Sequence, residues 1–183
     1  MSAMNVEILA PAGSVDALTA AVRCGAAAVY LGVEEFNARR SAHNFTTESL
    51  REAVAFCRAR GVAVYLTLNT LVRQEELDKA VDVAIRAAQC GVDALILPDV
   101  GLARRLRAMM PDMPLHASTQ LSCHTPEGVK FLRDAGFSRV VLAREMTKEE
   151  IDACADTGCE REIFVHGALC MCVSGQCYLS AML

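Results

Sequence analysis

Three cysteines crowd together near the end of the sequence, in residues 170–177 (CMCVSGQC). Thiolates placed in this way can bind soft metals, either zinc or an iron–sulfur cluster. Cys170 and Cys177 have six residues between them, more than the roughly two to four that zinc sites favour. We expect Cys170 and Cys177 to be metal ligands. Because two sulfurs do not complete a four-ligand site, further ligands would come from beyond Leu183, or else from Cys172 and His166.

His166 stands shortly before these cysteines and has three interpretations. It is a metal ligand, a general base, or a histidine that ends a strand with no chemical role. A histidine beside a cysteine lowers the pKa of the thiol, so His166 and Cys170 would also suit nucleophilic catalysis. The sequence alone leaves these alternatives open.

The elements that position these residues follow one repeated pattern of a helix, a glycine and a short apolar run. Glycines suited to the left-handed position after a helix stand at 25, 61, 91, 136 and 158. Caps open the helices, among them Ser14, Thr47, Thr125 before Pro126, and Thr147 with Glu150. We expect seven strands, near residues 6–10, 27–31, 62–68, 94–97, 115–121, 139–143 and 162–166, with six helices between them.

Strands that alternate with helices predict right-handed βαβ units and a parallel sheet. A doubly wound sheet is one solution, but a parallel (β/α) TIM-type barrel accounts better for the polar residues that end almost every strand. We expect residues 1–183 to form a single incomplete barrel domain, truncated after about seven strands and six helices. The C-terminal remainder of the barrel and later domains would be missing. The open seam between the first and seventh strands would favour association into a homo-oligomer.

Polar side chains gather at the carboxyl ends of the expected strands, where barrel enzymes have their active sites. His116, Ser118 and Gln120 share one face of the 115–121 run by alternation, and Arg144 and Glu145 end the sixth strand. The catalytic candidates are His116, Ser118, Gln120, Arg144, Glu145 and His166, and the substrate-binding candidates are Glu7, Arg39, Arg40, Asn69 and Asp99.

Several of these candidates have simpler explanations. Asp99 is as well suited to capping the following helix as to contacting a substrate. Glu7 and Arg144 could form an ion pair inside the barrel with no catalytic role. Arg39 and Arg40 could hold an anionic group or lie in a solvated loop.

The composition limits the class of protein. The 183 residues are 53% hydrophobic with a net charge of −4, which argues against wrapping by a nucleic-acid backbone but leaves a local contact open. No signal segment opens the chain, and no apolar run reaches the ~18 residues that span a bilayer. We therefore expect a cytoplasmic protein with no membrane contact and with reduced cysteines.

Motifs along the whole chain resemble those of the collagenase-like peptidase family U32. They are residues 7–13 (EILAPAG), 28–32 (AVYLG), 67–70 (TLNT), 116–120 (HASTQ), 141–145 (VLARE), and, most specifically, 166–170 (HGALC) with 174–177 (SGQC). The resemblance covers the chain from end to end and keeps the motifs in order.

This resemblance implies one of two activities for the full-length protein. Some family members carry the name of peptidase and act on collagen, while others take part in oxygen-independent hydroxylation of RNA pyrimidines or of a quinone precursor. In the hydroxylation members four cysteines hold a 4Fe-4S iron–sulfur cluster, and the first two match Cys170 and Cys177. Prephenate is implicated as the hydroxyl source in the RNA branch.

We therefore expect an iron–sulfur-dependent enzyme that hydroxylates a pyrimidine of tRNA or rRNA. The alternatives are a collagenase-like peptidase acting on a peptide substrate and a non-catalytic scaffold subunit. Because two of the four cluster ligands would lie after residue 183, we expect this part of the chain to be inactive by itself.

Overall fold

The structure is a computed structural model that describes residues 6–36, 44–167 and 172–175. Seven parallel strands lie in the sheet in their order along the chain. They are β1 (Leu9–Pro11), β2 (Ala28–Gly32), β3 (Ala63–Thr67), β4 (Ala94–Leu97), β5 (Leu115–Ala117), β6 (Arg139–Val141) and β7 (Glu160–Glu162). The helices are α1 (Val15–Arg23), α2 (Thr47–Arg58), α3 (Leu77–Cys90), α4 (Val100–Met109), α5 (Pro126–Asp134) and α6 (Lys148–Ala153), with short 3-10 turns η1 (Gln74–Glu76) and η2 (Thr119–Leu121).

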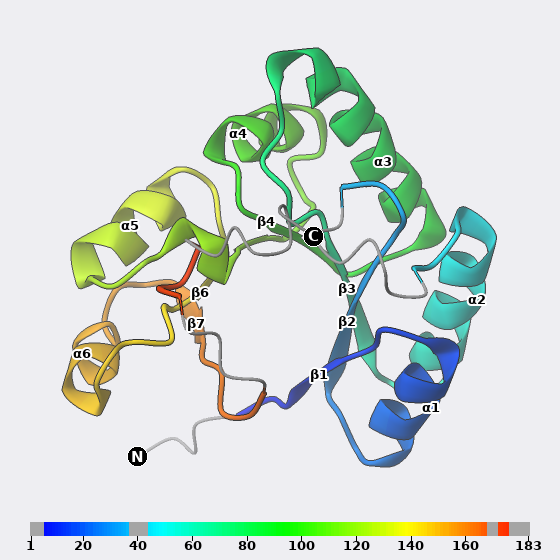
Figure 1. Cartoon of the computed structure of the whole chain (residues 1–183), viewed down its shortest axis with the longest axis horizontal. Helices are drawn as coiled ribbons and strands as arrows, with labels where there is room; N and C mark the ends of the chain where they lie inside the picture. Colours follow the sequence, from blue (N-terminus) through cyan, green and yellow to red (C-terminus); the bar gives the residue numbers. More distant parts are fainter. Residues whose placement is uncertain (1–5, 37–43, 168–171, 176–183) are drawn as a thin grey trace.

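The sheet curls into an incomplete barrel with the helices on its outer side (Figure 1). Each strand pairs only with its sequence neighbours, whereas a doubly wound sheet would reverse the strand order at its centre. Among the described residues no ladder joins β7 to β1. The expected TIM-type barrel arrangement is therefore confirmed.

Two expected strands end differently in the structure. The run expected at 115–121 leaves the sheet after Ala117, because Ser118 opens the turn η2 and its hydroxyl accepts a hydrogen bond from the N–H of Gln120 at 3.3 Å. The run expected at 162–166 is paired earlier, at Glu160–Glu162, and residues 163–165 follow it with exposed side chains. The last β6–β7 ladder pair joins Val141 to Glu162, and within the described residues the apolar run that follows is in no ladder.

The helix starts agree with the caps expected from the sequence. The hydroxyls of Ser14, Thr125 and Thr147 each accept a backbone N–H of the first turn, and Glu150 closes the capping box at Thr147. For α2 the cap is Thr46, one residue earlier than expected. These side chains bind N–H groups that a helix leaves without internal partners.

The main core lies between the sheet and the helices. It is built mostly from leucine, valine and alanine, and Leu66, Leu95 and Leu102 in it are fully buried. A second, smaller cluster contains Ala28, Ala94 and Tyr65. These residues alternate along their strands with the main-core residues, so they line the inner side of the curled sheet.

None of the described helices is long and apolar enough to cross a membrane. The longest described helix, α3, has 14 residues, against the roughly 20 that span a bilayer.

Arginines join successive helix–strand units at three places. Arg58 of α2 donates to the carbonyl of Gly91 after α3 at 2.9 Å. Arg107 of α4 donates to the carbonyl of Gly136 after α5 at 2.6 Å, and Arg133 of α5 donates to a carbonyl after α6 at 2.5 Å. Each arginine holds a turn that leads into a later strand. We call these contacts the arginine braces.

Arg107 is the brace with the most acceptors, because its guanidinium also donates to the carbonyls of Pro111 and Met113. We predict that Arg107→Ala lowers the free energy of unfolding by about 2–3 kcal/mol, since hydrogen bonds to a charged group are lost together. Arg104→Ala on the exposed side of the same helix is the matched control and should change it by less than about 0.5 kcal/mol. Urea unfolding measures both, and equal effects would contradict a special role for Arg107.

Candidate functional site

Residues 172–175, which lie between Cys170 and Cys177 in the sequence, dock onto the loops that follow β5 and β6. Ser174 is buried, with 1% of its surface exposed. Its backbone N–H donates to the Glu145 carboxylate at 2.7 Å, and its hydroxyl accepts the N–H and the Nε–H of Arg144, both at 3.2 Å. Since these loops begin at the carboxyl ends of their strands, the docked segment lies at the mouth of the barrel.

Two further contacts complete this docking. The Ser122 hydroxyl donates to the Ser174 carbonyl, and Arg144 donates through Nη2 to the carbonyl of Cys172 at 3.1 Å. Gly175 has φ +78°, and a Cβ there would overlap the carbonyl oxygen of Gln120. Only glycine fits this position without displacing the backbone. We call Ser122, Arg144, Glu145, Ser174 and Gly175 together the latch.

His124 lies beside the latch, in the loop between β5 and α5. Its Nδ1 is 2.5 Å from the carbonyl oxygen of Ser122. Its Nε2 is 3.6 Å from the second carboxylate oxygen of Glu145. The imidazole and the carboxylate are both partly open to solvent, with 40% and 35% of their side-chain surface exposed.

The carboxyl of Glu145 is held in its ionised form. Partial loss of water raises its pKa, but hydrogen bonds from its own N–H and from Ser174, with the charge of Arg144, outweigh this effect and lower the pKa overall. A carboxyl with a lowered pKa stabilises the latch at neutral pH and loses this effect as the pH falls through its folded-state pKa.

His116 points away from the latch, into the interior of the barrel. It is 3% exposed and packs edge-to-face against Tyr65, with ring centroids 4.8 Å apart. Its Nδ1 has no hydrogen-bond partner in the described structure. Burial, and secondarily the charge of Arg139, lowers the pKa of His116 to about 3. The imidazole is therefore neutral at physiological pH.

The remaining mouth candidates are dispersed. Ser118 is buried and caps η2, while Gln120 is exposed because the strand has already ended. Asn69 follows β3 and is half-buried. Asp99 accepts the N–H of Leu102 at 2.8 Å, so it caps α4. Of the described sequence candidates, Arg144 and Glu145 bind the docked segment through their side chains, and Gln120 approaches it with its backbone carbonyl.

Glu7 is not at the mouth, contrary to the expectation from the sequence. It precedes β1 and pairs with Arg139 at 3.3 Å, at the amino-terminal end of the strands. Arg139 also pairs with Glu160 at 2.7 Å and lies 3.8 Å from Glu162, the pKa of which is raised by burial. The expected ion pair between Glu7 and Arg144 does not form. β1 begins after Glu7, so this residue belongs to the opposite end of the barrel.

Several candidates lie outside the described residues. Cys170, Cys177, Arg39 and Arg40 are among them, and their placement at the mouth stays a prediction. His166 is described and exposed. Within the described part of the chain, no three histidine, cysteine, aspartate or glutamate side chains gather as a metal site would require.

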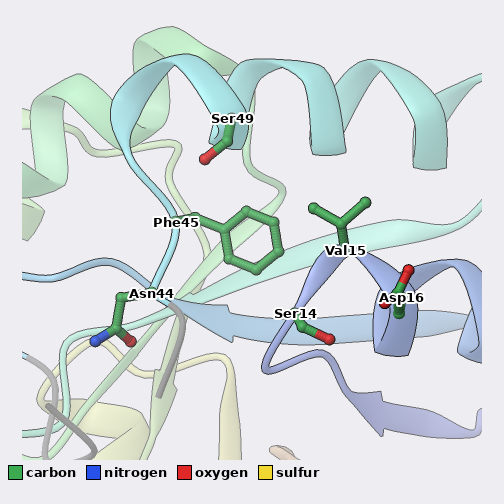
Figure 2. Close-up of a pocket in the computed structure, with 6 residues that line it drawn as sticks. All are labelled: Ser14, Val15, Asp16, Asn44, Phe45 and Ser49. Carbon is green, nitrogen blue, oxygen red and sulfur yellow. The ribbon is translucent and has the colours of Figure 1, made fainter. Parts of the chain in front are cut away.

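A shallow hollow of about 330 Å³ lies between the starts of α1 and α2. Figure 2 shows Ser14 and Asp16 from the first of these helix starts, with Phe45 and Asn44 from the segment that leads into the second. Asn44 directly follows the loop that carries Arg39 and Arg40. The hollow therefore lies beside residue 44, where the described part of the chain resumes after residues 37–43.

Sequence reasoning missed Ser122 and His124. Neither stands in a recognisable motif, and both lie between the strand expected at 115–121 and the helix expected from Thr125. The sequence feature that could have indicated them is Ser118, which caps the turn η2 and so ends the strand before Ser122 and His124. Their contacts with Glu145 and Ser174 depend on the tertiary structure.

Comparison with known proteins places the chain. The profile of Peptidase family U32 matches residues 13–183. The chain belongs to this family. Among solved structures, the U32 peptidase Mk0906 superposes with a TM-score of 0.73 at 18% identity, covering 89% of this chain and 70% of that one. At this identity the superposition shows the shared fold alone.

Relatives with curated names carry two kinds of activity. The 23S rRNA 5-hydroxycytidine C2501 synthase of Escherichia coli is 41% identical over 98% of this U32 chain, and the tRNA hydroxylation protein P1 of Bacillus subtilis is 37% identical over 95%. The collagenase of Porphyromonas gingivalis is 39% identical over 98%. The chain spans 27%, 42% and 46% of the length of the synthase, protein P1 and the collagenase, respectively.

The latch generates a prediction about Gly175. Gly175→Ala places a Cβ against the Gln120 carbonyl at a left-handed φ, so the docked segment should separate from the barrel. We expect the cysteines of residues 170–177 to react with a thiol reagent at least about tenfold faster. A weakening of the docked state by about 1.4 kcal/mol would produce this change. Gly13→Ala is the control, because its added Cβ meets no atom within 4 Å. Unchanged thiol reactivity in Gly175→Ala would refute the latch.

The lowered pKa of His116 generates a second prediction. A histidine that is protonated in the unfolded chain near pH 6.5 but only near pH 3 when folded costs stability as the pH falls between these values. Each pKa unit corresponds to about 1.4 kcal/mol, so unfolding at pH 5 should be markedly easier than at pH 7. His116→Leu should reduce this pH dependence and leave the melting temperature at pH 7 unchanged or raised. A large loss of stability at pH 7 would instead make His116 a structural residue.

Proposed function

We propose that the full-length protein is an iron–sulfur-dependent enzyme that hydroxylates a pyrimidine of tRNA or rRNA without oxygen. The names of the rRNA synthase and of the tRNA hydroxylation proteins support the choice of RNA as substrate. The U32 family assignment is compatible with this choice, because those proteins match nearly the whole chain.

The observation that carries the proposal is the latch. The segment between Cys170 and Cys177 is pinned to the carboxyl-end mouth by Arg144, Glu145 and Ser174. In barrel enzymes the substrate binds at this mouth. The docked segment, which lies between the two proposed ligand cysteines in the sequence, is thus placed where a substrate would bind.

The residues present fit an iron–sulfur cluster in two respects. Thiolates are the usual ligands of such clusters, and the close approach of Gly175 to Gln120 fixes the short chain between the two cysteines. Cys170 and Cys177 would hold one side of the cluster, and further ligands would come from residues after 183. When bound, the cluster would supply redox or Lewis-acid chemistry at the mouth.

The chain's own residues would bind and orient the RNA. Arg39 and Arg40 are proposed to contact phosphate oxygens beside the hollow between α1 and α2, as bidentate guanidinium groups do. Asn69 is proposed to contact the base from the end of β3. Prephenate remains the proposed hydroxyl source, and its carboxylates would need cationic partners of the same kind.

The experiment is a measurement of modified nucleosides together with bound iron. Deletion of the gene should remove one hydroxylated pyrimidine from tRNA or rRNA, and the full-length gene should restore it. We expect Cys170→Ala and Cys177→Ala to abolish restoration and to remove iron and acid-labile sulfide from protein purified without oxygen. Cys24→Ala is the matched control. Cys24 is exposed at the C-terminal end of α1, the end of the helix that lies away from the mouth.

An unchanged nucleoside pattern after gene deletion would overturn the RNA proposal. Full restoration by Cys170→Ala would overturn the role of the cluster while leaving the RNA substrate in place.

A peptidase is the second candidate, favoured by the collagenase relative. His166 would then act as base to a Cys170 nucleophile. Cleavage of gelatin by the purified full-length protein that survives chelation, but not His166→Ala or Cys170→Ala, would establish this candidate over the first.

A further inference from the structure

Among the described residues, His124 is a titratable side chain that contacts the latch residues Ser122 and Glu145 but does not touch the docked segment. It extends from the β5–α5 loop beside Glu145 and is partly open to solvent. It makes none of the hydrogen bonds that hold Ser174. The contacts that the structure gives its ring are those of its two nitrogens, with Ser122 and with Glu145.

The surroundings of His124 fix which nitrogen can exchange a proton. Nδ1 faces the carbonyl oxygen of Ser122 at 2.5 Å, and a carbonyl only accepts hydrogen bonds. Nδ1 therefore keeps its proton whether the ring is neutral or charged. Nε2 is the nitrogen that gains and loses a proton.

One carboxylate lies beside this ring, that of Glu145 at 3.6 Å from Nε2. The carboxylate of Glu150 on α6 is held by hydrogen bonds from Thr147, which lower its pKa, and the charge of His124 is a smaller cause of the same shift. The 3.6 Å separation is longer than a direct hydrogen bond of about 2.7–3.2 Å. Nε2 therefore makes no direct hydrogen bond to Glu145 and can accept one from a substrate group.

We propose that His124 is the general base of the mouth, accepting a proton from the bound substrate at Nε2, and that Glu145 positions and stabilises it. This inference rests on the proposed function and names the residue that would carry its proton transfer. In the step, the proton of a substrate C–H or O–H bond moves to Nε2 and the bonding electron pair stays on the substrate. The exposed imidazolium then releases the proton to water.

This arrangement follows the logic of other catalytic histidines. One nitrogen is fixed by a neighbouring acceptor, so the ring has one orientation and one active tautomer. Glu145 differs in one respect from the carboxylate of a catalytic triad, because it lies beside the accepting nitrogen and not beside the opposite one. Histidine suits the task because its charge changes near neutral pH.

The test uses variants of the full-length protein in an oxygen-free extract of the deletion strain, which supplies co-reactants and unmodified RNA. His124→Asn keeps an amide N–H in the place of Nδ1 and removes Nε2. We expect it to slow formation of the hydroxylated nucleoside by at least about 100-fold, as loss of a general base does, with iron content unchanged. His124→Ala should be equally slow, and added imidazole should restore part of its rate.

The control and the pH dependence separate this role from a structural one. Glu149→Gln, at an exposed position next to Glu150, should leave the rate unchanged. The wild-type rate should fall as the medium is acidified and the base becomes protonated, and the residual rate of His124→Asn should lack this fall.

Each other outcome is decisive. If wild-type protein forms no hydroxylated nucleoside, the proposed function fails, and this inference fails with it. If wild type is active and His124→Asn matches it, only the role of His124 is overturned. A loss in His124→Ala that imidazole does not restore, with or without loss of iron, also contradicts proton transfer by this residue.

Discussion

Parallel pairing of neighbouring strands is the constraint on which the candidate site depends. Because β5, β6 and β7 run in one direction, the loops that follow them all begin at the same end of the sheet. Ser122 follows β5, Arg144 follows β6 and Ser174 follows β7. An antiparallel neighbour would have sent one of these loops to the other end of the sheet, and the hydrogen bonds among them could not form.

The latch also shows how a polar segment is buried without loss of stability. An unpaired buried polar group costs about 1–3 kcal/mol, and Ser174 would bring three such groups to the mouth. Its N–H, its carbonyl and its hydroxyl are each paired. The Arg144 side chain donates to the Ser174 hydroxyl and to the Cys172 carbonyl, and the Glu145 carboxylate accepts the Ser174 N–H. Two adjacent residues of opposite charge thus pair with both acceptors and a donor of the docked segment.

Much of the fold could be predicted from the sequence, because local rules determine it. The caps at Ser14 and Thr147 and the positive-φ glycines after the helices each depend on residues a few positions apart. Residues whose place depends on which of several partners they bind were harder to predict. Ser118 ends β5 early because its hydroxyl caps a turn, and Glu7 was misplaced because β1 starts only a few residues later than expected.

The site was predictable to the extent that its residues belong to strand ends. Arg144 and Glu145 directly follow an apolar strand, and both lie at the mouth. Asp99 illustrates the limit, since an aspartate before a helix can cap it or bind a ligand and the sequence does not distinguish the two. His124 could not have been selected, because its proposed role depends on Glu145, a residue from a different loop.

The arginine braces have a consequence for the order in which the chain acquires its structure. In each brace the arginine comes earlier in the sequence than the carbonyl it holds: Arg58 before Gly91, and Arg107 before Gly136. During synthesis on the ribosome, every donor therefore emerges before its acceptor. Each of the three braced units would meet a guanidinium already presented by an earlier helix, so assembly is directed from the earlier units toward the later ones.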